Sequence, residues 1–126
     1  MPVAERSDVL IALDGAAGRT GCGFMGVFSS GIRKATNKSR LNLSNGFIYF
    51  YLKSNYIQNI ILEHSASRTT ITHAGASIDD MMLPINKNLA TLNNELNILY
   101  EKLLILIEEN NKLNHLKQLY LKKFFD

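Results

Sequence analysis

Arginine and lysine are concentrated in the middle of this 126-residue chain, where seven cations and one acid lie between residues 19 and 68. Such cations bind phosphate groups, and nearby Ser, Thr and His side chains can hydrogen-bond phosphates or base edges. The candidate contacts are Arg19, Arg33, Lys34, Lys38, Arg40 and Arg68, with Thr69, Thr70 and His73 as hydrogen-bonding residues. The pattern indicates a nucleic-acid interface, and a solvated basic face is the alternative that composition leaves open.

A glycine motif lies just before most of these cations. The run Gly21-Cys22-Gly23-Phe24-Met25-Gly26 has the G-x-G-x-x-G spacing of dinucleotide-binding proteins. That fingerprint needs a helix directly after the glycines and an acid about 20 residues further on. Here a β-prone segment follows, and there is no acid between Asp14 and Glu63. We interpret the match as accidental and expect no cofactor.

The residues that a nucleophilic or metal-dependent reaction would need are Cys22, His64 and His73. No C-x-x-C, H-E-x-x-H or comparable spacing organises them, and a single cysteine among glycines is typical of a small packed residue. The pair Asp14-Gly15 is typical of a turn, and Asp79-Asp80 of a cap or a partner-facing charge. We therefore expect no catalytic activity.

The overall composition favours one modest core rather than two domains, since only 126 residues with 46% hydrophobic content are present. The formal net charge of +3 permits a nucleic acid or an acidic partner without requiring either. With one cysteine the chain cannot form an internal disulfide, which is typical of a reducing compartment. No apolar run approaches the roughly 18 residues that span a bilayer. We expect a cytoplasmic protein with no membrane partner.

The elements that must position the basic residues are short. A strand is predicted at 9–13, and six glycines between residues 15 and 31 favour short strands and tight turns, with strand pieces at 27–30 and 32–34. The polar segment 36–46 is predicted to be a loop. The segment 46–64 is predicted to be one helix, because it is too long for a typical strand, and 65–77 is polar and β-prone. The fold class expected is α+β.

The last third of the chain is predicted to be one long helix with a coiled-coil seam. Apolar residues recur in alternating steps of three and four from Leu89, which we assign to heptad position a. The residues expected to carry assembly are Leu92, Leu96, Leu99, Leu103, Leu106, Asn110, Leu113 and Tyr120. Asn110 and Lys117 fall at a positions, where polar groups cost stability but fix register. A helix folded back on its own chain is the alternative.

In its amino-acid sequence, most of the chain resembles the specificity subunit of type I restriction-modification systems. The resemblance rests on the order and spacing of several segments before the terminal helix. These are Val9–Gly15, Ser29-Ser30-Gly31, Leu52-Lys53-Ser54, Thr69-Thr70-Ile71 and Leu83-Pro84.

The resemblance implies a partial target-recognition domain at 1–84 and a coiled-coil helix at 85–126. It implies that the chain reads double-stranded DNA without catalysing any reaction. In that family two such domains are separated by an antiparallel helix pair, and the helices dock methyltransferase subunits and, through them, the restriction subunit. The resemblance therefore implies a homodimer or pairing with another specificity-subunit helix. A coiled-coil interaction protein that does not bind DNA alone is the second hypothesis.

Overall fold

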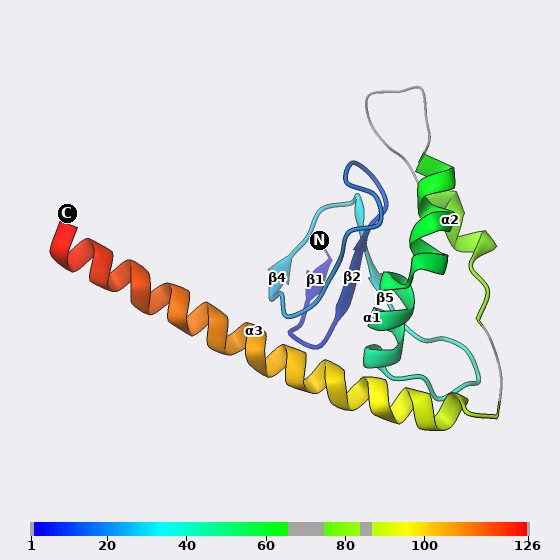
Figure 1. Ribbon diagram of the computed structural model, residues 1–126. Coiled ribbons are helices and arrows are strands. Elements are labelled where there is room, and N and C mark those ends of the chain that lie inside the picture. Colours follow the sequence, from blue (N-terminus) through cyan, green and yellow to red (C-terminus); the bar gives the residue numbers. More distant parts are fainter. Residues whose placement is uncertain (1, 66–74, 84–86, 126) are drawn as a thin grey trace.

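The computed structural model describes residues 2–65, 75–83 and 87–125, and it is a mixed α+β fold, as the sequence predicts. The strands are β1 (Val3–Ala4), β2 (Val9–Ala12), β3 (Thr20–Gly21), β4 (Gly26–Val27) and β5 (Ile32–Ala35). The helices are α1 (Asn45–Lys53), α2 (Asn55–Ser65), the 3-10 helix η1 (Gly75–Asp80) and the long α3 (Leu89–Phe125). The small domain sits on the first half of α3, whose second half extends beyond it (Figure 1).

Strand β2 is the centre of a three-stranded antiparallel sheet of order β3-β2-β5. It pairs with β5 in a register that sets Val9 opposite Ala35 and Ile11 opposite Arg33. Strands β1 and β4 form a separate two-stranded antiparallel sheet. The strand predicted at 9–13 is thus confirmed within one residue, but the piece predicted at 27–30 is wrong beyond residue 27. The chain turns there instead, and the backbone N–H of Ile32 donates to the carbonyl of Ser29 (3.1 Å).

The predicted helix at 46–64 is two helices, because Ser54 ends one and begins the next. The backbone of Ser54 is extended (φ −64°, ψ 150°), and its N–H donates to the carbonyl of Tyr51 (3.1 Å). Its hydroxyl oxygen accepts from the backbone N–H of Ile57 (3.4 Å), as an N-cap does. The break lets Leu52 of α1 and Ile57 of α2 both reach the core, where they are 7% and 0% exposed. The prediction that 65–77 is β-prone is wrong for residues 75–77, which belong to the 3-10 helix η1.

The core lies between one face of β2 and the helices that pack against it. Val9, Ile11 and Leu13 from the β2 segment meet Tyr49 and Leu52 of α1. Residues of α2 and α3 complete the cluster. The division predicted between residues 84 and 85 lies outside the described residues, but the first half of α3 shares this core.

Helix α3 is fixed to the domain by Tyr100 and Asn93. The ring of Tyr100 is 2% exposed, and its hydroxyl donates to the carbonyl of Ser7 (2.9 Å). The side-chain oxygen of Asn93 accepts from both the backbone N–H (2.8 Å) and the hydroxyl (3.0 Å) of Ser44, which caps α1. These contacts join the α1 N-terminus and the N-terminal segment to the same two turns of α3.

Gly46 lets α1 and α3 approach closely. A Cβ at this position would lie 2.7 Å from the Cα of Asn97, 2.7 Å from the Cβ of Tyr100 and 2.8 Å from the carbonyl oxygen of Leu96. These atoms belong to the α3 backbone or lie next to it, so they cannot rotate away. The helix crossing therefore requires glycine.

Candidate functional site

Four of the predicted DNA-contacting cations lie together on β5 and the loop that follows it. Arg33 and Lys34 are neighbours in β5, and Lys38 and Arg40 are exposed in the loop before α1. Because successive side chains of a strand point to opposite faces, Arg33 and Lys34 leave the strand on different sides. Strand β5 has β2 as its neighbour and lies at an edge of the sheet, among the strands that the structure describes. We call these four residues the basic edge.

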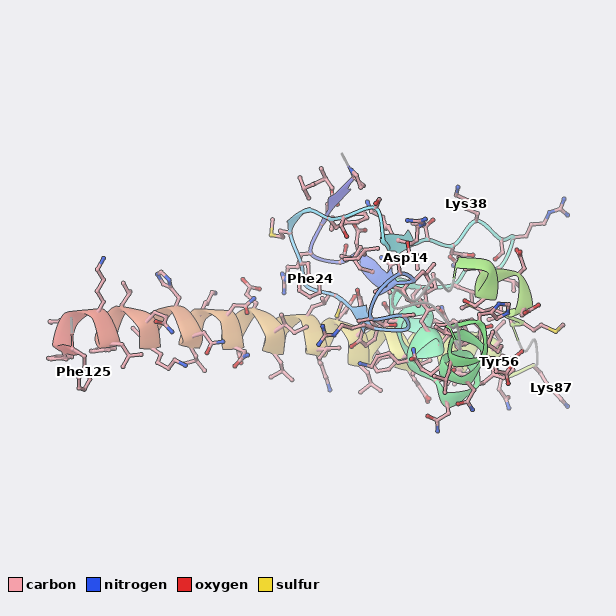
Figure 2. All side chains as sticks on the ribbon, turned by 90° about the horizontal axis from the view of Figure 1, so that it is seen from above. Asp14, Phe24, Lys38, Tyr56, Lys87 and Phe125 are labelled. Atoms are coloured by element: carbon pink, nitrogen blue, oxygen red, sulfur yellow. The ribbon has the colours of Figure 1, made fainter. Side chains whose placement is uncertain are left out.

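A small hydrogen-bonded turn holds the loop part of the basic edge. The side-chain oxygen of Asn37 accepts from the backbone N–H of Ser39 (3.0 Å), and its side-chain N–H donates to the carbonyl of Leu41 (2.5 Å). This turn fixes the backbone around Lys38 and Arg40 while both side chains stay exposed. Figure 2 shows Lys38 pointing away from the domain.

Lys34 is partly neutralised by Asp8. The two charged groups are 3.1 Å apart, and the Asp8 side chain is only 17% exposed. The pKa of Asp8 lies below its usual value, mainly because its carboxylate accepts the backbone N–H of Glu5 (2.8 Å), with further lowering from Lys34. The Arg33 guanidinium donates to the carbonyl of Ser30. Within the basic edge, the ion pair with Asp8 thus holds Lys34 against the N-terminal segment.

An apolar groove of about 320 Å³ lies beside the basic edge. Its lining includes Arg33, Lys34 and Lys38, together with Leu52 of α1 and Ile78 of η1. A phosphate at the rim would meet the cations, while an apolar group in the groove would meet Ile78. Sequence patterns missed η1 as part of this surface, because nothing in a short polar segment indicates which loop it covers.

The other predicted contacts are separated from the basic edge or lie outside the described residues. Arg19 directly precedes β3, at the opposite edge of the sheet. It is exposed beside an apolar cavity of about 620 Å³ that Leu10, Phe24 and Val27 also line. Arg68, Thr69, Thr70 and His73 all lie outside the described residues.

The residues considered for catalysis do not come together. Cys22 is 5% exposed in the core, and burial raises the pKa of its thiol despite opposing hydrogen bonds with Tyr100 and Tyr49. His64 pairs with Asp80 across α2 and η1. In the part of the chain that the structure describes, no three His, Cys, Asp or Glu side chains group as metal ligands. Strand β4, rather than a helix, ends the glycine motif, so the element that would hold a pyrophosphate is missing there.

The coiled-coil seam of α3 divides into two sets. Leu96 and Leu103, at a positions, are half-buried against the chain's own domain. The residues at d positions are exposed, by 44 to 64%, and these are Leu92, Leu99, Leu106, Leu113 and Tyr120. Asn110 is exposed too, as is every residue from Glu108 to Phe125.

The residues that dock α3 on the domain lie outside the seam, and of these the sequence pattern indicated Leu104 and Ile107 as a second apolar face but not Tyr100. Tyr100 and Leu104 are buried and Ile107 is half-buried, at e and b positions beside the seam. Arg6 adds an ion pair with Glu108 (2.9 Å). The extra apolar residues outside the 3.5-residue repeat were the available signal. Of the described helices, none is long and apolar enough to cross a membrane.

Comparison of the chain with protein-family models, curated proteins and solved structures gave no match.

Proposed function

We propose that this chain is a non-catalytic DNA-recognition subunit of the type I restriction-modification kind. Its basic edge contacts double-stranded DNA, and α3 joins it to a second helix and to methyltransferase subunits, which bring the restriction subunit. Two features support the proposal. The domain carries exposed cations on one edge, and it is mounted on a helix that extends well beyond it.

The observation that carries the DNA part is the placement of Arg33, Lys34, Lys38 and Arg40 within eight residues of one strand and its loop. A strand edge followed by a fixed loop can place several cations along a phosphate backbone, where each cation neutralises one phosphate. Specific readout needs hydrogen-bonding side chains as well, and Thr69, Thr70 and His73 stay predictions for that role. The apolar groove beside the edge offers contact to sugar or thymine methyl groups.

Salt dependence of binding to random double-stranded DNA tests this proposal. Four phosphate contacts predict a slope of about −3.6 in log K against log salt, so affinity should fall roughly 150-fold from about 50 to about 200 mM salt. The variant Arg33→Ala/Lys38→Ala should halve the slope, to about −1.8, so that the fall is roughly 12-fold. Lys34 is left in place because of its contact with Asp8.

The matched control is Lys87→Ala/Lys122→Ala, which removes two exposed cations elsewhere. Lys87 lies away from Lys38 in Figure 2, and Lys122 lies near the far end of α3. The control should keep the wild-type slope. Equal losses in both double variants would mean that net charge, rather than the basic edge, drives binding. Absence of binding at low salt would end the DNA proposal for this chain.

The second candidate is a coiled-coil interaction protein without independent DNA binding. The exposed residues of the second half of α3 favour it, since their apolar surface needs a partner whether or not DNA is bound. This candidate predicts assembly with no salt-dependent DNA binding. The salt titration therefore separates the two.

A further inference from the structure

The apolar cavity of about 620 Å³ lies on the face of β2 that is turned away from the core. Val9 and Ile11 belong to the core cluster, whereas Leu10 is buried on the opposite face, because successive strand residues alternate. Strands β1 and β4 lie on one side of β2, and helices α1 and α2 lie on the other (Figure 1). Residues of both sheets line the cavity, including Ala4 of β1 and Val27 of β4. We call it the inter-sheet cavity.

The strand register brings Arg19 to this cavity. Leu10 lies opposite Gly21 in the pairing of β2 with β3. Two residues further along β2, the backbone N–H of Ala12 donates to the carbonyl of Arg19 (2.9 Å). Opposite residues of an antiparallel pair share a face, so Arg19 leaves the sheet on the same face as Leu10 and Ala12.

The charge of Arg19 is unopposed at this position. Among the described residues that line the inter-sheet cavity, Arg19 alone is charged. None of the ion pairs between described residues includes Arg19. The cavity therefore presents one cation beside an apolar wall.

Several apolar side chains of the cavity wall are open to solvent. Phe24, Met25 and Val27 are 58%, 80% and 61% exposed. The ring of Phe24 lies over Gly21, because a Cβ on Gly21 would be 2.7 Å from a ring carbon. Exposed apolar side chains around a cavity are typical of a binding site, since an occupant would remove them from water.

We infer that the inter-sheet cavity binds a small carboxylate with an apolar tail, the carboxylate on Arg19 and the tail against Leu10 and Phe24. Such a ligand site goes beyond DNA recognition and is independent of it. The volume lies within the range of small-molecule sites, about 300–1,000 Å³. A guanidinium binds a carboxylate through two parallel hydrogen bonds. One guanidinium also balances one negative charge, whereas a phosphate group carries about −1.5 to −2.

Titration with hexanoate, followed through the backbone amide chemical shifts of the whole chain, tests this site. A ligand of this size is expected to bind with a Kd on the order of 1 mM. The shifts should centre on residues 10–12 and 19–27. Hexan-1-ol has the same tail without the charge and should bind about five- to tenfold more weakly. No saturable shift up to about 10 mM hexanoate, or equal affinities for the two probes, would overturn the inference.

Two variants assign the parts of the site. Arg19→Gln removes the charge, so it should weaken hexanoate binding about five- to tenfold and leave hexan-1-ol binding unchanged. Arg19→Lys keeps a charge and should keep most of the preference for hexanoate. Phe24→Ala changes an exposed side chain and should weaken both probes by a similar factor, because both tails lose the same contact. An Arg19→Gln variant that still prefers hexanoate would refute the role of Arg19.

The second half of α3 is another place where an apolar anion could bind. Residues 110–125 carry four lysines and no acid, whereas residues 89–109 carry one lysine and four glutamates. Lys122→Gln is therefore the matched control, and it should leave the affinity for hexanoate unchanged. Shifts confined to residues 110–125, or a loss in Lys122→Gln as large as in Arg19→Gln, would place the ligand on α3 and overturn the cavity site.

Discussion

Replacing Gly46 by alanine tests whether α1 and α3 are packed as closely as the structure has them. In a free helix this change is stabilising, because alanine has a helix propensity up to about 1 kcal/mol better than glycine. Here the new Cβ would lie 2.7 Å from two α3 atoms, whereas ordinary contact begins at 3.4 Å. The helices must then separate by several tenths of an ångström.

Overpacking of this kind costs about 1–3 kcal/mol, so the net effect of Gly46→Ala should be a loss of roughly 1–2 kcal/mol in the free energy of unfolding. Urea unfolding followed by far-UV circular dichroism, at one fixed protein concentration, measures it. Asn59→Ala is the control, because Asn59 is exposed in α2 and gains propensity without a steric conflict. The control should be neutral or slightly stabilising.

The same variant has a local consequence, because Cys22 lies in the core cluster with Tyr100 and Leu104 of α3. Loosening α3 should expose the Cys22 thiol more often and speed its reaction with a thiol reagent in native buffer. Gly46→Ala that is as stable as wild type, or more so, would refute the packing argument. Loss of stability with unchanged thiol reactivity would place the damage away from α3.

Two further predictions follow from titratable groups whose pKa the fold shifts. Burial raises the pKa of Cys22, so its thiol should stay protonated near pH 8. Its reaction with a thiol reagent should be about a hundredfold or more slower in the folded chain than in the urea-unfolded chain. A rate near that of the unfolded chain would contradict the burial of Cys22. The folded-state pKa of Asp8 is lowered from 3.8, so its contribution to stability is present above that value and is lost as pH falls through the folded pKa. Asp8→Asn should therefore destabilise the chain at pH 6 in urea unfolding, and the difference from wild type should shrink below about pH 4; a constant difference would exclude the linkage.

The sequence patterns correctly predicted the elements whose defining residues are close together in the chain. The strand at Val9–Ala12 is an apolar run between Asp8 and Gly15, and α3 has an apolar repeat that only Asn110 and Lys117 interrupt, so both elements depend on local information. The break at Ser54 was missed, since serine is tolerated within a helix, and its hydroxyl can bond either to the helix or as a cap. The basic edge was found only in part. Arg33, Lys34, Lys38 and Arg40 are close in sequence and stay together, while Arg19 is moved to another sheet edge by the order β3-β2-β5.

The sequence by itself determined that α3 is long, that its apolar residues recur every 3.5 residues and that its charges divide along its length. Only the tertiary structure decided which apolar residues serve the chain's own core. Tyr100 packs beneath α1 because Gly46 removes the side chain that would block it, and this places the domain on the e side of the seam. A repeat shows that a helix has apolar faces, but it does not say which face is covered within the chain. That choice depends on contacts between residues 46 and 100, which no local pattern contains.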